Sequence, residues 1–193
     1  NKTITVTDAL FFDADGDGDT DLYLVSGGAD YYLNNKNYQD ELYENDGHGN
    51  FKKLTDALPL ETISGSCVRA ADYNRDGKLD LFVGSKIMPG LFPATPESFL
   101  LKNISSSGHI QFQKDNTQKD SSFSHAGLIT DAVWIDINKD GWQDIVMAGE
   151  YMPISIFINN SGSFRNETVA YGLENSNGLW CRLLADDFDN DGD

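Results

Sequence analysis

The stretch DADGDGDTDL (residues 13–22) recurs twice in this 193-residue chain, as DYNRDGKLDL (residues 72–81) and DINKDGWQDI (residues 136–145). A fourth copy, DFDNDGD, occupies residues 187–193. Each full copy fits the pattern D-x-[DN]-x-D-G-x-x-D and is followed by an apolar residue. This repeated pattern indicates a bound cation, the length of a structural repeat and the architecture of the fold.

Oxygen-bearing side chains occupy alternate positions of each copy, so they can converge on one hard cation. A glycine follows where the chain must turn sharply, and the next residue varies so much that only its backbone carbonyl is a plausible ligand. An all-oxygen donor set favours Ca²⁺, because zinc prefers Cys or His and magnesium keeps more water. The expected ligand positions are Asp13, Asp15, Asp17, Asp19 and Asp21; Asp72, Asn74, Asp76, Lys78 and Asp80; Asp136, Asn138, Asp140, Trp142 and Asp144; and, in the fourth loop, Asp187, Asp189 and Asp191.

An EF-hand is the nearest alternative, but it needs a glutamate at the twelfth loop position and flanking helices. The twelfth positions here are Leu24, Val83 and Met147, and the runs LYLV, LFVG and IVMA after the closing aspartates indicate buried strands. A turn that is merely rich in Asp and Gly is the other alternative, and three copies in register argue against it. We therefore expect three complete calcium loops between strands, and an incomplete fourth that lacks its closing aspartate.

The composition is strongly acidic, with 31 Asp and Glu against 14 Lys and Arg and a net charge of −17. Fifteen of the 31 acidic residues lie in the four loops, so much of this charge is ligand chemistry. Such a surface repels nucleic acid, and no membrane span is visible in the sequence. Because free Ca²⁺ is plentiful outside cells, we expect an extracellular, cell-surface or periplasmic protein. Cys67 and Cys181 are expected to be buried, unpaired thiols.

The repeat extends beyond the loops. The loop starts lie 59, 64 and 51 residues apart, and each unit contains four short strand-like segments. This period and strand content predict an all-β fold of β-propeller blades, with a calcium loop between the first two strands of each blade. A parallel solenoid would need a shorter repeat. The expected domain is a single partial propeller, with blades at about residues 3–60, 63–122 and 126–173 and the start of a fourth at 178–193.

These loops, each following an inner strand, resemble the FG-GAP and VCBS repeats, which are related to the calcium-bearing blades of integrin α-subunits. The longer phrases around them, such as DALFFDADGDGDTDLYLVSGG (residues 8–28), resemble the propellers of the ASPIC/UnbV group. The resemblance implies that the loop residues bind Ca²⁺. It also implies a ring of about seven blades, whereas this sequence holds three and the start of another.

Catalytic patterns are weak in this sequence. His48, His109 and His125 show no metal-ligand spacing, and there is no nucleophile elbow, P-loop or C-x-x-C pair. The loops that join the second and third strands of each repeat are expected at residues 26–41, 85–98 and 149–155. They should share the rim opposite the calcium loops, and they carry aromatic residues. These rings either pack between blades or form a ligand rim; the candidates are Tyr31, Tyr32, Tyr38, Phe92 and Tyr151.

We therefore expect a calcium-stabilised interaction module whose partner is a protein, matrix component or glycan. One alternative is a carbohydrate-active enzyme, a lyase or hydrolase, which would need a carboxylate pair away from the calcium loops. A second alternative is a purely structural module that presents a neighbouring domain. Because three blades cannot close a ring, their open faces are also expected to favour self-association.

Overall fold

The computed structural model describes residues 4–106, 108–118 and 121–186, and these residues form an all-β fold without an α-helix. Three antiparallel sheets follow one another along the chain. They comprise β1 (Val6–Phe12), β2 (Asp21–Ser26), β3 (Glu41–Asn45) and β4 (Phe51–Leu54); β5 (Gly65–Ala71), β6 (Asp80–Ser85), β7 (Phe99–Asn103) and β8 (Phe112–Lys114); and β9 (Leu128–Ile135), β10 (Asp144–Met152), β11 (Ser155–Asn160) and β12 (Ser163–Asn166), with a short β13 (Gly178–Leu179).

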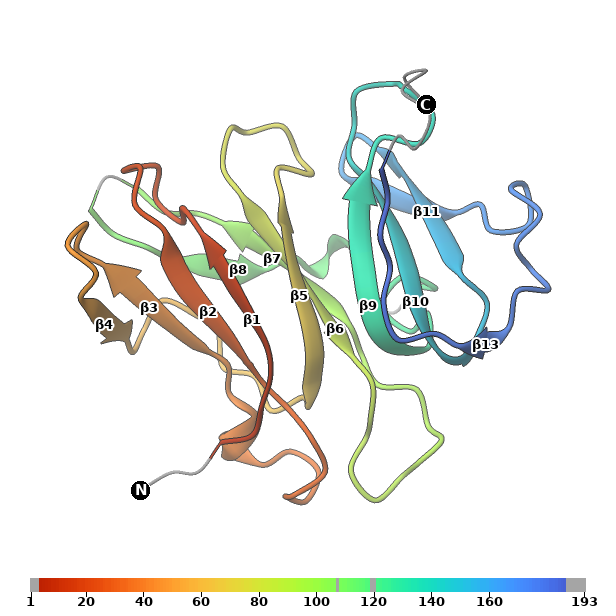
Figure 1. Cartoon of the computed structure of the whole chain (residues 1–193), viewed down its shortest axis with the longest axis horizontal. Helices are drawn as coiled ribbons and strands as arrows, with labels where there is room; N and C mark the ends of the chain where they lie inside the picture. Colours follow the sequence, from red (N-terminus) through yellow and green to blue (C-terminus); the bar gives the residue numbers. More distant parts are fainter. Residues whose placement is uncertain (1–3, 107, 119–120, 187–193) are drawn as a thin grey trace.

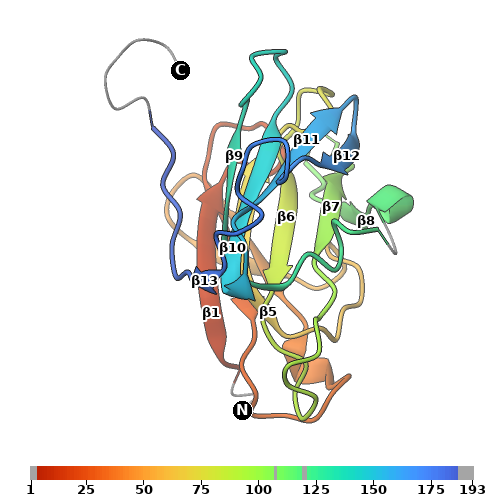
Figure 2. The same ribbon diagram turned by 90° about the vertical axis from the view of Figure 1, so that its right-hand side faces the viewer.

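The sheets stand side by side in chain order, as a fan (Figure 1), and the view turned by 90° shows the strands running along its height (Figure 2). Within each sheet the four main strands are paired in sequence order. The inner strands β1, β5 and β9 contact one another from sheet to sheet. The predicted all-β, partial β-propeller architecture is therefore confirmed, with the ring left open. The predicted residue limits of each blade remain a prediction.

The second strand of each sheet is its most buried element. All of β6 is buried, because it is flanked by β5 and β7 and covered by sheets on both faces. The third sheet departs from expectation: residues 149–155 were predicted as a variable loop, but β10 continues to Met152. The prediction is wrong because β13 pairs with Glu150 and Met152 and so extends the strand.

Two apolar clusters fill the spaces between neighbouring sheets. The first joins sheets one and two around Leu42, Val83 and Leu101. The second joins sheets two and three, where Phe123 contacts the rings of Phe82, Phe157 and Phe164. Burial of these side chains stabilises the fan, at about 1.5–3 kcal/mol for each large apolar group.

Polar side chains link the sheets at the inner strands. Arg69 of β5 donates to Asp8 of β1 at 2.7 Å and also to Asp131 of β9, so one guanidinium joins all three sheets. Asp8 also accepts the backbone N–H of Val68, and Asp131 accepts that of Leu183. The segment after β13 therefore contacts the third sheet through a backbone N–H to aspartate hydrogen bond, which is the type of bond that also joins the second sheet to the first.

In the second and third sheets, an asparagine near the end of the third strand ties the sheet to a loop of the preceding sheet. The side-chain amide of Asn103 donates to the carbonyl of Ala14 at 2.8 Å, and that of Asn159 donates to the carbonyl of Tyr73 at 2.8 Å. Both asparagines are buried. Asn45, the equivalent residue in the first sheet, donates only within its own sheet, to Thr20.

Cys67 and Cys181 are both free thiols. Cys67 is buried, as predicted, and its burial raises the pKa of the thiol to about 12. The prediction that Cys181 is buried is wrong, because it lies in the exposed segment that follows β13.

We predict that Asn159→Ala lowers the free energy of unfolding by about 2–4 kcal/mol, because it leaves the carbonyls of Tyr73 and Gln143 without their amide donor. The matched control, Asn45→Ala, removes no contact between sheets and should cost about 1 kcal/mol. Chemical denaturation of the two variants measures the difference. Equal losses would show that the contact between sheets contributes nothing.

Asp40, before β3, is buried and accepts hydrogen bonds from the Tyr23 hydroxyl and the Ser26 N–H, each at 2.7 Å. Burial raises its pKa to about 7. A carboxyl group with a raised folded-state pKa holds its proton more tightly in the folded chain. Its contribution to stability is therefore full below about pH 4 and is lost as the pH rises toward 7.

We predict that Asp40→Asn gains stability relative to the original chain as the pH rises from 4 to 8, by on the order of 2 kcal/mol or more. Asparagine keeps the shape of the side chain but does not ionise. Denaturation curves of both chains at each pH give the difference, in which the other titrating groups cancel. A difference that stays constant with pH would contradict the raised pKa.

Candidate metal centre

The three acidic loops lie between the first and second strands of their sheets, at residues 13–20, 72–79 and 136–143, and they share one rim of the fan (Figure 1). Each loop turns back between two antiparallel strands whose pairing closes just below it, at Phe12–Asp21, Ala71–Asp80 and Ile135–Asp144. The strand pairing therefore places the closing aspartate opposite the start of its own loop.

In the first loop the backbone folds around the Asp13 carboxylate. Its two oxygens accept the N–H groups of Gly16 and Gly18, at 2.7 and 3.0 Å. Both glycines have positive φ angles, 81° and 94°, which allow this tight turn. One oxygen each from Asp13, Asp15 and Asp21 lies within 4.8 Å of the others, which brings three carboxylates to one point.

The second and third loops repeat this geometry. Asp72 accepts the N–H groups of Asp76 and Gly77, at 3.0 and 2.9 Å, and Asp136 accepts those of Asp140 and Gly141, at 3.1 and 2.7 Å. The fourth loop position has a positive φ in all three copies and is occupied by Gly16, Arg75 (58°) and Lys139 (59°). Two non-glycine residues thus bear backbone strain that keeps the loop shape.

The closing aspartates Asp21, Asp80 and Asp144 are 3%, 0% and 0% exposed, so three carboxylates are buried beneath the loops. Burial, together with the neighbouring loop carboxylates, raises the pKa of all three, that of Asp80 to about 7. Burial and, as a smaller effect, repulsion from Asp17 also raise the pKa of Asp15. Among the described residues, no ion pair compensates a closing aspartate.

Each closing aspartate also fixes the third strand. Asp21 accepts the N–H of Asn45 at 2.9 Å, Asp80 that of Asn103 at 2.7 Å, and Asp144 that of Asn159 at 2.7 Å. Asn103 and Asn159 also provide the contacts between sheets described above. The loop, the third strand and the preceding sheet are therefore joined through one aspartate and one asparagine.

The residue at the seventh loop position bonds to its own loop through its backbone N–H. The N–H groups of Asp19, Lys78 and Trp142 donate to the aspartate two residues before, at 2.8–3.1 Å. The side chain of Lys78 reaches away to the carbonyl of Ser105, at 2.5 Å, and the ring of Trp142 lies 4.3 Å from the guanidinium of Arg75. These side chains are used outside their own loops.

Sequence reasoning missed two residue types that hold the loops together. Arg75 in the second loop donates to the carbonyls of Gly141 and Asp140 in the third, at 3.1 and 3.3 Å, so adjacent loops are directly linked. The other missed residues are Asn103 and Asn159. The recurrence of an asparagine near the end of each third strand could have pointed to them. The sequence alone did not indicate that their side chains bond to the carbonyls of Ala14 and Tyr73.

The ligand positions predicted in the fourth loop, Asp187, Asp189 and Asp191, lie outside the described residues. The rim candidates are not brought together as one set. Tyr31 and Tyr38 contact each other, with ring centroids 5.9 Å apart. Tyr38 is only 1% exposed, so its ring packs inside the loop and cannot contact a ligand. The prediction that Tyr38 belongs to the ligand rim is therefore wrong. Tyr32 is 90% exposed and stands apart, whereas Phe92 and Tyr151 contact each other at 6.3 Å.

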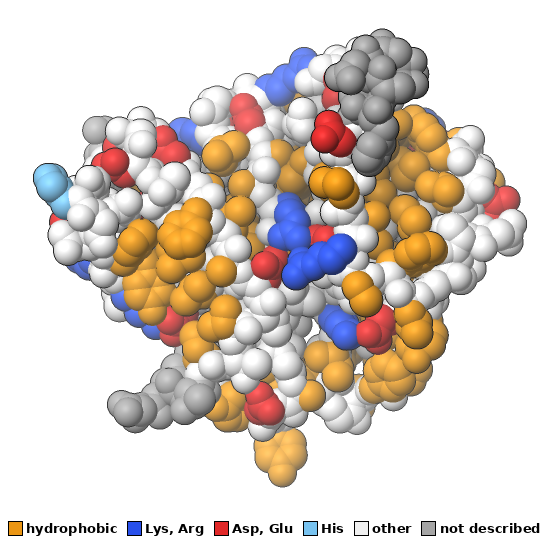
Figure 3. Space-filling model, in the orientation of Figure 1, with side chains coloured by type: hydrophobic (Ala, Val, Ile, Leu, Met, Phe, Trp, Pro, Cys, Tyr) orange, Lys and Arg blue, Asp and Glu red, His pale blue; other side chains and the backbone are white. Residues whose placement is uncertain are grey.

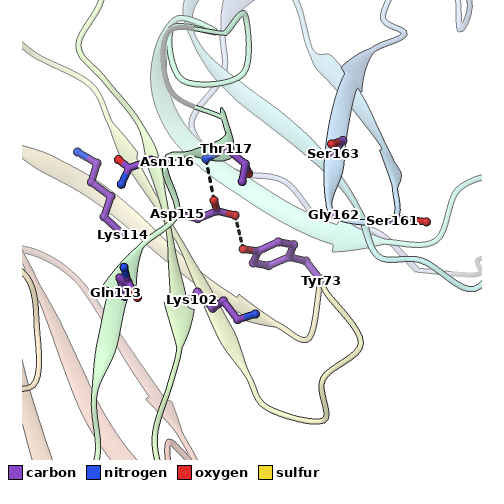
Figure 4. A pocket seen from close by; sticks show the side chains of 10 residues that line it. All are labelled: Tyr73, Lys102, Gln113, Lys114, Asp115, Asn116, Thr117, Ser161, Gly162 and Ser163. Carbon is purple, nitrogen blue, oxygen red and sulfur yellow. Dashed lines mark hydrogen bonds between the residues drawn. The ribbon is translucent and has the colours of Figure 1, made fainter.

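A groove of about 640 Å³ lies next to the second loop, between the outer strands of sheet two and the β11–β12 turn. Tyr73 and Asp115 point toward each other across it and share a 2.6 Å hydrogen bond (Figure 4). Asp115 also accepts the N–H of Thr117 at 2.8 Å. Burial and the bond to Asp115 raise the pKa of Tyr73. The polar groups that converge in this groove thus satisfy one another and anchor the second loop.

Comparison with known proteins agrees with this geometry. The chain is 27% identical over 117 residues to cartilage acidic protein 1 of Xenopus tropicalis, an alignment that covers 60% of this chain and 16% of that protein. In the described residues, no helix is long and apolar enough to cross a bilayer. The profile of the FG-GAP-like repeat matches residues 13–83 and 108–193, which include all four acidic loops. The chain therefore belongs to the FG-GAP-like repeat family.

Proposed function

We propose that this chain is a calcium-stabilised interaction module of an extracellular or cell-surface protein, with no catalytic activity of its own. The burial of Asp21, Asp80 and Asp144 beneath further carboxylates carries this proposal. A buried carboxylate without a cationic partner costs free energy, and several close together cost more. A divalent cation in each loop would turn this repulsion into attraction.

The residues of each loop fit Ca²⁺. In the first loop the ligands would be Asp13, Asp15, Asp17 and Asp21, with the backbone carbonyl of Asp19. The second and third loops offer the same set with Asn74 or Asn138 in the second place. In the present geometry the Asn74 amide donates to Asp80, and a half-turn of that amide would present its oxygen instead. An oxygen-only set of this size suits Ca²⁺ better than Mg²⁺ or Zn²⁺.

The role of calcium would be structural. It would supply the positive charge that lets three buried carboxylates remain ionised, and the protein residues would hold strand, loop and neighbouring sheet in place around it. Backbone N–H groups of the loop already bond to the carboxylates of Asp13 and Asp136, so the position of these oxygens depends on the folded loop. Binding would therefore couple directly to folding.

The interaction role is supported by membership of the FG-GAP-like repeat family and by the similarity to cartilage acidic protein 1. The carboxylate pairs described away from the acidic loops, Glu61 with Glu97 and Asp8 with Asp131, are each bridged by one basic side chain, Lys114 or Arg69, which argues against the lyase or hydrolase alternative. A requirement for millimolar Ca²⁺ would agree with an extracellular, cell-surface or periplasmic location. The partners we propose are protein, matrix or glycan surfaces.

The open face of the first sheet supports a further contact with another blade or a second copy. Phe11 of β1 is 59% exposed and Phe51 of β4 is 42% exposed, and their rings contact each other at 6.1 Å. Hydrophobic groups are visible over this sheet at the left of Figure 3. In contrast, the inner strands β5 and β9 are covered by their neighbours. Such exposed rings favour burial against another sheet.

We predict that a chelator lowers the melting temperature of the calcium-loaded chain by roughly 15 °C or more, since each occupied site adds about 2.7 kcal/mol at a hundredfold excess over Kd. Differential scanning calorimetry with calcium, with chelator and with magnesium measures this shift. Magnesium should restore little of it. A melting temperature that is indifferent to the chelator would refute the calcium assignment.

Single substitutions test which residues hold the ion. Asp80→Asn should remove about a third of the calcium-induced shift, because it disables one of three loops. Asp19→Asn is the matched control, since that side chain is not expected to be a ligand, and its shift should equal that of the original chain. Calorimetric titration should count one ion fewer for Asp80→Asn only. The same loss in both variants would contradict the ligand assignment.

A further inference from the structure

A second groove, of about 530 Å³, lies between the second and third sheets at the rim opposite the acidic loops. Residues of the β6–β7 loop form one side, with Phe92, Pro93 and Thr95, and the end of β10 forms the other, with Tyr151. Hydrophobic side chains gather beside charged groups near the lower end of the third sheet (Figure 3). Because both walls come from adjacent sheets, the groove does not belong to an open face of the fan.

Tyr151 is the unusual residue of this groove. Its φ angle is 59°, in the left-handed region that a bulky side chain adopts only at a cost, and glycine would fit there without strain. The ring is nevertheless 67% exposed, so packing within the chain does not account for it. The register of pairing with β13 shifts between Glu150 and Met152, so Tyr151 lies at a bulge in β10, and bulges of this kind re-aim side chains beside binding sites.

Phe92 completes an aromatic platform. Its ring is 57% exposed and lies 6.3 Å from that of Tyr151, at an interplanar angle of 66°. Buried Leu128 and Met152 line the same groove beneath these rings. Two exposed rings at an angle present apolar faces to a ligand while the edges remain open to water.

The electrostatics of the groove favour a neutral ligand. Among the described residues that line it, only Glu150 is charged, and its carboxylate lies 2.6 Å from the ammonium group of Lys86. Lys86 lines a neighbouring groove, so within this one the Glu150 carboxylate can accept hydrogen bonds from hydroxyl groups while its charge stays paired. A charged ligand would find no complementary group that is not already paired.

The backbone of the groove disfavours an extended peptide. A peptide that adds a strand needs a free sheet edge. At Glu150 both edges of β10 are taken, one by Leu128 of β9 and the other by Leu179 of β13. Recognition here must therefore use side chains.

We propose that this groove binds a neutral glycan, with the C–H faces of sugar rings on Phe92 and Tyr151 and sugar hydroxyls at the carboxylate of Glu150. A sugar matches the groove because it combines an apolar ring face with hydroxyl groups and no charge. This inference rests on the proposed interaction function and names its ligand class and site.

The test uses the calcium-loaded 193-residue chain and four neutral probes, cellohexaose, xylohexaose, mannohexaose and chitohexaose, with titration calorimetry. At least one probe is expected to bind saturably. Tyr151→Gly and Phe92→Ala should each weaken that binding about tenfold or more. Tyr151→Gly also relieves the backbone strain, so its melting temperature should be unchanged or higher, which separates lost binding from lost folding. Tyr32→Ala, an exposed ring on the same rim, is the control and should bind normally.

Three results would overturn the proposal: no binding of any probe, binding that both groove variants retain, or binding confined to an acidic oligosaccharide such as hexagalacturonate or to a peptide. The calcium-induced rise in melting temperature is recorded on the same samples. A chain that keeps this rise but binds no neutral probe retains the proposed calcium function and refutes only the glycan site.

Discussion

The buried closing aspartate of each acidic loop is the constraint on which the rest of the structure depends. Asp21, Asp80 and Asp144 lie at the junction of the loop, the second strand and the third strand, and each accepts the N–H of an asparagine. Burial of such a group is costly unless its charge is offset. The three sheets repeat this arrangement, so each of them requires a positive charge near its closing aspartate.

The asparagines extend the local constraint across the fan. Asn103 and Asn159 bind a closing aspartate through their backbone and a loop of the preceding sheet through their side chain. Arg75 adds a direct link between the second and third loops. A change in one loop therefore alters the packing between neighbouring sheets. The loops and the apolar clusters stabilise the same contacts, so the loops are not independent surface turns.

The repeated acidic pattern was sufficient to predict the all-β architecture, because its period and the strand-like runs around it are local properties of the sequence. The length of β10 was mispredicted, since it depends on pairing with β13, nearly thirty residues away in sequence. The burial of Tyr38 and the exposure of Cys181 depend likewise on tertiary packing. Among the rim candidates, only packing could show that Phe92 and Tyr151 meet while Tyr32 stands alone.

The backward reach of the asparagines has a consequence for the order of events during synthesis. The amide partner of Ala14 lies 89 residues further along the chain, and that of Tyr73 lies 86 residues further. A nascent chain therefore cannot complete one acidic hairpin until most of the next sheet has left the ribosome. Contacts of such long sequence separation slow folding. The acidic loop of one blade gains its last hydrogen bond only when the next blade has folded against it.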